Sequence, residues 1–355
     1  RDIFLSIRYQ QVPDALAPLP GTTWSPLALM TELVVRHESW PLAQTFTISR
    51  GSRTTAEVVV VELHGDGVRG SGECVPYPRY DETVEGVIGL IESLRIDLES
   101  GLDRETLQER LPGGAARNAL DDAFWDLEAK RTGIPVQQRL GISDPAPVIT
   151  AYTLSLDSPE KMGAAARQNV HRPLLKSKLA GDGDLERMAA IRENAPDATL
   201  IVDANEGWSA DQVEPFSAEL ARLGIAMIEQ PLPAAQDAIL TELDHPVPLC
   251  ADESCHTSGD LERIAPRYDL VNIKLDKTGG LTEALVLKEK ARALDLGVMV
   301  GCMIGSSLAM APAALLAQEV DYVDLDGPLL LGRDRDPGLR YEGSLLYPPL
   351  PELWG

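Results

Sequence analysis

Residues 199–229, TLIVDANEGWSADQVEPFSAELARLGIAMIE, contain one complete strand–helix–strand unit. An apolar run ends at Asp203, a helical stretch covers residues 210–223, and a second apolar run ends at Glu229. Two strands that a helix joins in this way are typical of a parallel sheet, in which both strands end at the same edge. The unit therefore predicts an α/β fold with two carboxylates at one edge of the sheet.

The same unit recurs on both sides of this stretch, at a spacing of about 25 residues, as a (β/α) barrel requires. The expected strands are residues 148–153, 174–179, 199–202, 226–228, 247–251, 270–273, 298–300 and 322–325. An open doubly wound sheet shows the same alternation, but no G-x-G-x-x-G motif follows any of these strands. We therefore favour a barrel.

The part of the chain before the barrel follows a different order. Residues 31–37 and 56–63 are expected to be strands, and a turn is expected between them at residues 50–53. Helices are expected later, the best of them over residues 115–130. Strands followed by helices predict a small α+β domain that ends near residue 140.

Residues 1–29 are rich in proline and show no sustained period. They also lack the basic, apolar and small-residue order of a signal peptide. We interpret them as a leader that is either peripheral to the fold or foreign to the natural protein, and we expect Met30 to be the natural start.

Charge and cysteine content narrow the functional classes. A net charge of −23 argues against nucleic acid or an anionic membrane as a partner. The four cysteines form no C-x-x-C pair, so we expect a reduced, cytoplasmic protein. Residues 297–317 are uncharged, but their glycines and Pro312 favour a buried strand, loop and helix over a membrane span.

Acidic residues end three successive barrel strands. Asp203, Glu229 and Asp252 are separated by 26 and 23 residues, in phase with the strand–helix repeat. Strand ends of a barrel meet at its active-site mouth, so these carboxylates are expected to surround one point. Three oxygen ligands favour Mg²⁺ over zinc and leave positions open for substrate and water. The alternative is that each acid only caps the helix after its strand.

Lysines flank these acids. Lys176 and Lys178 share one face of their strand, and Lys274 ends a strand four positions further round the barrel. Repulsion between Lys176 and Lys178 is expected to favour a neutral amine in one of them. Lys178 and Lys274 would then face each other across the mouth, as two bases that invert a carbon centre must. The alternative is a set of surface lysines paired with neighbouring acids.

Further polar residues are expected around the mouth. Asp324 and Asp326 share a face at the end of the last strand and would attract a cation such as an ammonium group, although an acidic turn is the alternative. Small residues over 301–307 allow helix-start N–H groups to approach a carboxylate. Asn205 and Asp276 are candidates for hydrogen bonds to the acids or lysines, and Asn205 is equally suited to a turn.

Several motifs together resemble the dipeptide epimerase branch of the enolase superfamily, among its muconate-lactonizing-enzyme-like members. They are Lys176-Ser177-Lys178, DANEGW (203–208), EQPLP (229–233), ADES (251–254), NIKLDKTGGL (272–281) and the helix RNALDDAFWDLEAK (117–130). The likeness extends from Met30 to about Tyr341. Within this branch the chain is most similar to the bacterial epimerases of L-Ala-D/L-Glu.

The resemblance implies a domain arrangement. It consists of a capping domain over residues 30–140, a modified TIM barrel of (β/α)7β type over 141–326, and a C-terminal segment, 327–355, that returns toward the cap. It also implies a single Mg²⁺ ion held by Asp203, Glu229 and Asp252.

The resemblance further implies how a dipeptide substrate is held. Asp324 and Asp326 are expected to bind its ammonium group, and the loop with Arg50 and Arg53 to select a glutamate side chain. The substrate is also expected to meet the region that contains Met303, Gly305 and Ser306, while Lys176 and Asn205 support the site. Surface positions are the alternative for both arginines.

The expected activity is inversion of the α-carbon of a dipeptide's C-terminal residue by two-base 1,1-proton transfer through an enolate. A mandelate-type racemase is disfavoured, because that branch needs a histidine at the end of the seventh barrel strand and no histidine follows His256. An o-succinylbenzoate synthase or a muconate cycloisomerase remains an alternative, as does a barrel that binds dipeptides without catalysis. Barrels of this kind often associate, so a homo-oligomer stays open.

Overall fold

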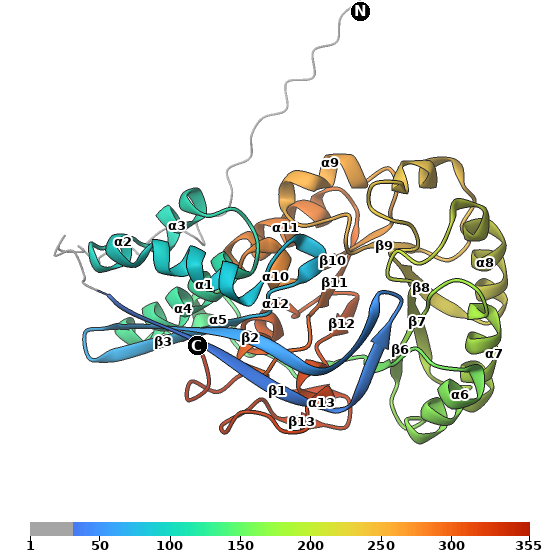
Figure 1. The fold of residues 1–355 in the computed structure, drawn as a ribbon, viewed down its shortest axis with the longest axis horizontal. Coiled ribbons are helices and arrows are strands. Elements are labelled where there is room, and N and C mark those ends of the chain that lie inside the picture. The colour runs from blue at the N-terminus through green and yellow to red at the C-terminus, as the bar shows by residue number, and fades with distance from the viewer. Residues whose placement is uncertain (1–30) are drawn as a thin grey trace, which may run out of the picture.

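The computed structural model describes residues 31–355, so the predictions for the leader and for Met30 lie outside the described part of the chain. A three-stranded antiparallel sheet with its helices lies beside an eight-stranded parallel barrel (Figure 1). The predicted α/β barrel with an N-terminal α+β domain is confirmed.

The N-terminal domain is built on β1 (Glu32–Ile48), β2 (Gly51–Gly65) and β3 (Val68–Cys74), which pair in sequence order. Its helices are the 3₁₀-helix η2 (Pro78–Tyr80), α1 (Val84–Ser93), α2 (Arg95–Glu99), α3 (Arg104–Arg110), α4 (Ala115–Thr132) and α5 (Val136–Arg139). Helix α4 was expected over 115–130 and lies against β3, where Gly70 and Gly72 let the two backbones approach closely.

The β1–β2 hairpin is much longer than its sequence suggested. The two strands pair continuously from Glu32 to Pro41, shift register, and pair again from Phe46 to a turn at Ser49 and Arg50. No residue of the outer half, 40–55, is buried, and Pro41 and the register shift that follows it interrupt the alternation by which strands are recognised. Figure 1 shows this hairpin (blue) extending from its own domain toward strands β6 to β8 of the barrel.

The barrel follows the predicted repeat. Its strands are β5 (Tyr152–Leu154), β6 (Leu174–Lys178), β7 (Thr199–Asp203), β8 (Ile225–Glu229), β9 (Leu249–Ala251), β10 (Leu270–Ile273), β11 (Gly297–Gly301) and β12 (Tyr322–Asp324). Each strand pairs with its sequence neighbour. The first and last strands are joined by a hydrogen bond from Ala151 N to Val323 O of 2.8 Å, which nearly closes the barrel.

Most connections in the barrel are helical. They are α6 (Pro159–Gln168), α7 (Asp184–Asn194), α8 (Ala210–Arg222), α9 (Leu261–Ile264), α10 (Leu275–Thr278), α11 (Leu281–Ala293) and α12 (Ser307–Leu316), with 3₁₀-helices η3 (Asp237–Glu242) and η4 (Ser258–Asp260). One detail differs from the prediction. The expected strand over 148–153 divides into β4 (Val148–Ile149) and β5.

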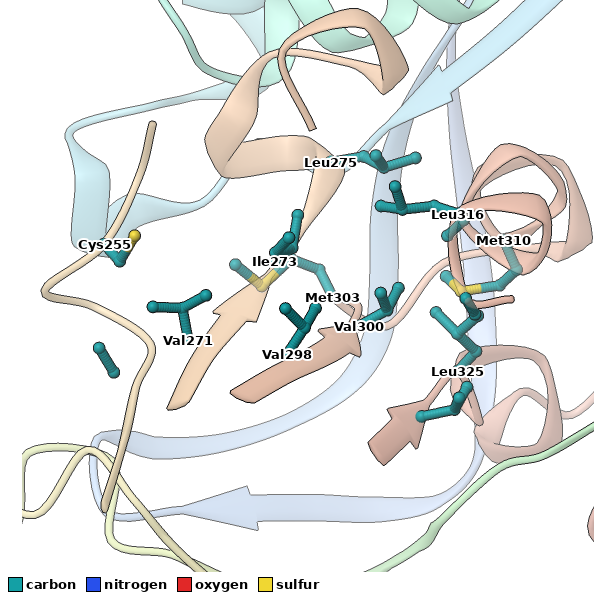
Figure 2. Close-up of a cluster of buried hydrophobic side chains, with 14 of the residues drawn as sticks. Cys255, Val271, Ile273, Leu275, Val298, Val300, Met303, Met310, Leu316 and Leu325 are labelled. Carbon is teal, nitrogen blue, oxygen red and sulfur yellow. The ribbon is translucent and has the colours of Figure 1, made fainter. Parts of the chain in front are cut away.

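Alternation along the strands separates two kinds of environment. In β10, Val271 and Ile273 pack outward against the helices, with Val298 and Val300 of β11 beside them (Figure 2). The residues between them face the barrel interior. A lower interior layer is apolar and contains Ala151, Leu174, Ile201, Met227, Cys250, Leu270 and Met299. The residues two positions further along form the layer above, which contains the predicted site residues Lys176, Asp203, Glu229 and Asp252.

The end of the chain packs against both domains. After α13 (Gly327–Leu330), strands β13 (Tyr341–Glu342) and β14 (Leu345–Leu346) form a small sheet with β4. Trp354 is buried, and its Nε1 donates to Asp122 O of α4 at 3.0 Å. The domain boundaries given above stay predictions. Within residues 31–355, no helix is both long and apolar enough to cross a membrane.

The close approach of β3 and α4 gives a stability prediction. A Cβ atom at Gly72 would overlap Ala119 O and lie 2.9 Å from Ala123 N, both backbone atoms of α4. We expect Gly72→Ala to lower the free energy of unfolding by about 3 kcal/mol, because the sheet must move away from the helix. Chemical denaturation measures this difference.

Gly89 provides the matched control, since it lies in α1 and a Cβ there would meet nothing within 4 Å. Gly89→Ala should leave the free energy of unfolding unchanged or raise it by up to about 1 kcal/mol through helix propensity. Equal effects of the two substitutions would contradict the packing argument.

Candidate active site

Three carboxylates meet at the carboxyl ends of neighbouring strands. Asp203 ends β7, Glu229 ends β8, and Asp252 follows the last residue of β9. One oxygen from each lies within 4.8 Å of the other two, and all three residues are buried. The structure thus brings the predicted metal ligands together, because parallel neighbouring strands end at one rim of the barrel.

Lys176 lies beneath this group and contacts three acids. Its Nζ is 2.5 Å from Glu229 Oε2, 2.8 Å from Asp324 Oδ2 and 3.3 Å from Asp203 Oδ2. Burial disfavours the ammonium form, but Asp324, Glu229 and Asp203 outweigh it and raise the pKa of Lys176 well above its usual value. Repulsion was expected to favour a neutral amine in one of Lys176 and Lys178, and the carboxylates around Lys176 indicate that Lys176 is not that amine.

Lys178 and Lys274 approach from strands on different sides of the barrel. The Nζ of Lys178 donates to Asp203 Oδ2 at 2.6 Å, and that of Lys274 donates to Asp252 Oδ2 at 2.6 Å. Both side chains line the same cavity. Strands β6 and β10 are separated by three others, so the two amines enter this cavity from different directions, as the sequence predicted.

The neighbouring lysines hold the pKa of two of the three acids below its usual value but not that of the third. Burial opposes ionisation of Asp203, but Lys178 and Lys176 hold the pKa of this carboxyl below its usual value. The pKa of Asp252 is also held well below its usual value, against burial, by Lys274 and Lys277. Burial, and then the charge of Asp203, raises the pKa of Glu229 to about 7. Of the three acids, Glu229 is therefore the one whose pKa is raised rather than lowered.

The donor set fits a hard divalent cation. The triad offers only carboxylate oxygens, and no histidine or cysteine belongs to it. Several of these oxygens are bonded to ammonium groups, which shows that the space between them accepts positive charge. Oxygen-only sites of this kind suit Mg²⁺. Asp203, Glu229 and Asp252 would hold the ion.

Two residues behind the triad were not predicted. Asn272 Nδ2 donates to Glu229 Oε1 at 2.7 Å, which orients this carboxylate. Lys277 Nζ donates to Asp252 Oδ1 at 2.7 Å and to the carbonyl oxygens of Asp252 and Asn272. Strand alternation was a usable signal for Asn272, since it lies two residues before Lys274. Lys277 lies in α10, and no pattern indicated its direction.

The tip of the β1–β2 hairpin reaches the loops that carry the triad. Arg50 Nη1 donates to Asn205 O at 3.0 Å, and Arg50 Nη2 pairs with Glu253 Oε1 at 2.8 Å and donates to Tyr77 OH at 3.1 Å. Arg53 also lines the cavity, with its guanidinium over the Tyr77 ring. Among the described residues Arg53 has no acidic partner, so the two arginines differ in how much of their charge is compensated.

Asp324 and Asp326 line the same cavity and both contact Thr153. Asp326 Oδ2 accepts from Thr153 N at 2.6 Å, and Asp324 Oδ1 accepts from Thr153 Oγ1 at 3.4 Å. Burial and the neighbouring Asp324 raise the pKa of Asp326 to about 7. Both residues line the cavity, so the structure supports a cation-binding wall and not a solvated turn.

Comparison with known proteins agrees with this geometry. Residues 161–337 match the family described as enolase C-terminal domain-like, and residues 30–141 match the N-terminal domain of mandelate racemase/muconate lactonizing enzyme. The chain belongs to the enolase superfamily. It is 50% identical over 320 residues to the L-Ala-D/L-Glu epimerase of Escherichia coli K12, covering 90% of this chain and 100% of that protein.

Solved structures of other superfamily members are similar. A member from Agrobacterium tumefaciens with homology to dipeptide epimerases, bound to sodium and L-Ala-L-Glu with an ordered loop, is 53% identical. Its TM-score is 0.90, and the match covers 92% of this chain and 100% of that one. A dipeptide epimerase from Enterococcus faecalis, complexed with Mg and L-Leu-L-Tyr, is 29% identical with a TM-score of 0.84, covering 90% and 97%.

Some predicted site residues of this superfamily member have other surroundings. Met303 lines the cavity, but Gly305 and Ser306 do not. The N–H of Ser306 donates to Glu73 Oε1 at 2.7 Å, so the helix start expected to meet a substrate carboxylate already binds one from the protein. The expectation of substrate contact is wrong for Ser306, because its partner comes from the other domain.

Asn205 and Asp276, which were both expected to support the site, have different partners. Asn205 has a φ of 45° and bonds Asp203 Oδ1 through its backbone N–H at 2.9 Å, so it is a turn residue that still supports the ligand. Asp276 instead accepts from Val75 N and from Asn118 Nδ2, both in the N-terminal domain, at 2.9 Å each. The expected hydrogen bond from Asp276 to an acid or lysine of the site is not observed.

Glu253 and the tyrosines Tyr77 and Tyr80 complete the cavity and were missed. Glu253 directly follows Asp252, and burial, then the charge of Asp252, raises its pKa to about 7. The ADES motif pointed to this position, but nothing in it showed that Glu253 binds Arg50, which lies 203 residues earlier in the sequence.

The triad gives a prediction for metal binding. We expect Asp203→Asn and Glu229→Gln each to weaken Mg²⁺ affinity by at least about tenfold, because each removes a charged oxygen ligand. Titration calorimetry with Mg²⁺ measures the affinity.

Glu206→Gln is the control. Glu206 is close to the triad but accepts from Arg79 Nε at 2.7 Å and from Ala234 N at 2.8 Å, outside it. Its substitution should leave Mg²⁺ affinity within about twofold. Unchanged affinity in both triad variants would refute the ligand assignment.

Proposed function

We propose that this protein is a Mg²⁺-dependent dipeptide epimerase that acts on L-Ala-D/L-Glu. The observation that carries the proposal is the pair of amines, Lys178 and Lys274, that enter one cavity from separate strands beside three clustered carboxylates. Two bases and a metal site are what inversion of a carbon α to a carboxylate requires.

The chemistry follows from the charge that develops on the substrate. When bound, the metal stabilises the negative charge that forms on the substrate carboxylate as the α-carbon loses its proton. One lysine, as the neutral amine, removes the proton from one face of the α-carbon. The other lysine, as the ammonium, returns a proton to the opposite face, which inverts the centre. The roles exchange when the other epimer is the substrate.

The walls of the cavity suit a dipeptide with a free amino terminus. Asp324 and Asp326 offer carboxylates to its ammonium group. Arg53 offers a guanidinium that no acidic side chain of the described chain compensates, so we assign it to the glutamate carboxylate. Arg50 already has Glu253 as its partner and holds the hairpin in place.

The alternatives fit the cavity less well. The substrates of an o-succinylbenzoate synthase or a muconate cycloisomerase are anions without an ammonium group. Asp324 and Asp326 would have no cation to bind in such a substrate. A barrel that only binds dipeptides has no need for both amines and all three acids, and none of these residues is replaced.

The biological setting follows from the substrate. L-Ala-D/L-Glu contains the first two residues of murein peptides, so we propose a role in murein peptide breakdown. We also propose that the protein is cytoplasmic, which the four unpaired cysteines support.

The two-base mechanism predicts the behaviour of lysine variants. Lys178→Ala and Lys274→Ala should each reduce epimerisation of L-Ala-L-Glu by roughly 10³-fold, the usual contribution of a general acid or base. In D₂O each variant should still exchange the α-proton of one epimer only, because one amine remains. Mass spectrometry and NMR follow the exchange.

Lys288→Ala controls for loss of a part-buried lysine, since Lys288 Nζ donates only to the carbonyl oxygens of Leu316 and Gln318, away from the cavity. It should retain full activity. Full epimerisation by either cavity variant would exclude the two-base mechanism.

The two arginines should differ in a substrate screen. Arg53→Met is expected to reduce kcat/KM for L-Ala-L-Glu by about 10- to 100-fold, the range for a lost hydrogen bond to a charged group, while L-Ala-L-Met is unaffected. Arg50→Met should reduce kcat/KM for both dipeptides alike, because Arg50 anchors the hairpin. Glutamate-selective loss in Arg50→Met alone would reverse the assignment.

A further inference from the structure

Glu73 is a buried carboxylate that the proposed proton transfer does not use. It is the second-last residue of β3, in the N-terminal domain, and it has no exposed surface. Burial raises its pKa, and this is opposed by the charge of Arg335 and by hydrogen bonds from Ser306. A buried acid of this kind destabilises the fold unless it is fully paired, so the choice of its partners calls for a functional explanation.

These partners come from distant parts of the chain. Ser306, at the start of α12, donates to Glu73 through its N–H and its hydroxyl group. Arg335, in the C-terminal segment, donates through Nη2 to Glu73 Oε2 at 2.6 Å and to Glu38 Oε2 of β1 at 2.7 Å. Glu73 therefore joins the first domain, the barrel and the C-terminal segment at a single point.

The segment held by this contact forms part of the cavity wall. Cys302, Met303 and Ile304 line the cavity and lead directly to Gly305 and Ser306. A Cβ at Gly305 would lie 3.1 Å from Glu73 Oε1, so the backbone there is packed against this carboxylate. On the other side, a Cβ at Gly327, next to Asp326, would lie 3.2 Å from Gly305 N and O.

We propose that Glu73 and Arg335 are positioning residues that fix the wall formed by residues 302–304 against the bound dipeptide. This inference rests on the proposed function for the identity of the ligand. The carboxylate of Glu73 accepts a hydrogen bond from the N–H of Ser306 at the start of α12. This bond holds the segment before α12 in one position relative to Asp326. The first domain thus shapes the barrel cavity from behind as well as through its hairpin.

Attachment of the two domains does not depend on this contact. Asp276 bonds Val75 N and Asn118, and Arg117 Nη2 donates to Thr278 O at 2.6 Å, all between the first domain and the barrel. Loss of the Glu73 charge should therefore release the 302–304 wall while the domains stay joined. This separates a positioning role from a merely structural one.

The test compares Glu73→Gln with Glu62→Gln in the full-length protein. Glu62 belongs to β2 of the same sheet and pairs with Arg36 Nη2 at 2.9 Å and Arg69 Nη1 at 3.2 Å, away from the cavity. Hydrogen–deuterium exchange read by mass spectrometry should show faster uptake over residues 302–308 in Glu73→Gln and unchanged uptake there in Glu62→Gln. This readout does not depend on any substrate.

Kinetics complete the test. In Glu73→Gln we expect KM for L-Ala-L-Glu to rise about tenfold with kcat reduced less than threefold, and Mg²⁺ affinity to stay within about twofold, because the triad is not touched. Arg335→Met should behave like Glu73→Gln, and Arg335→Lys should recover part of the loss. Should Glu73→Gln fail to fold, the two Arg335 variants carry the same measurements.

Unchanged exchange over 302–308 in Glu73→Gln and Arg335→Met, or an unchanged KM, would overturn the proposal. So would a loss of Mg²⁺ affinity parallel to the loss of activity, which would indicate general disruption. Failure of the wild-type protein to epimerise L-Ala-L-Glu would instead reject the proposed function, and the exchange data would still decide whether Glu73 holds the segment.

Discussion

The barrel mouth depends on the mutual compensation of buried charges. Asp203, Glu229 and Asp324 all contact the single ammonium group of Lys176, which is 1% exposed. A buried charge without a partner destabilises a fold by several kcal/mol. Removal of any one of these groups would therefore leave its partners buried without a compensating charge. The apolar interior layer below them excludes water and strengthens each of these interactions.

The first domain completes what the barrel leaves open. Its hairpin brings Arg50 to Glu253 and Asn205 at the front of the cavity, and its sheet brings Glu73 to Ser306 at the back. Both contacts join a charged group of one domain to a strand-end loop of the other. A small movement of the first domain would therefore change the cavity from two sides, while the triad stays fixed on its strands.

The parts of the site that the sequence predicted are those set by local periodicity. Asp203, Glu229, Asp252 and Lys274 follow the strand–helix repeat, and side-chain alternation in a strand directs them inward. The sequence could not reveal partners that lie far along the chain. Nothing near Ser306 indicates that Glu73, 233 residues away, occupies its N–H group. The outer half of the hairpin was missed for a local reason, since Pro41 and the register shift before Phe46 break the strand alternation there.

The surroundings of Lys176 show why proximity in sequence alone does not decide which lysine keeps its charge. Lys176 and Lys178 share one strand face, yet Lys176 contacts three carboxylates whereas Lys178 and Lys274 each contact one. The side chain of Lys178 is 11% exposed and that of Lys274 is 7% exposed, against 1% for Lys176. A lysine bound by three acids holds its proton firmly and serves as a fixed counter-charge. Burial opposes the ammonium form of Lys274, but Asp252 and Glu229 outweigh it and raise the pKa of Lys274 too. The distinction between the lysines therefore lies in their contacts: Lys178 and Lys274 each pair with one acid and have more exposed side chains, which supports the proposal that these two carry the protons while Lys176 is a structural cation.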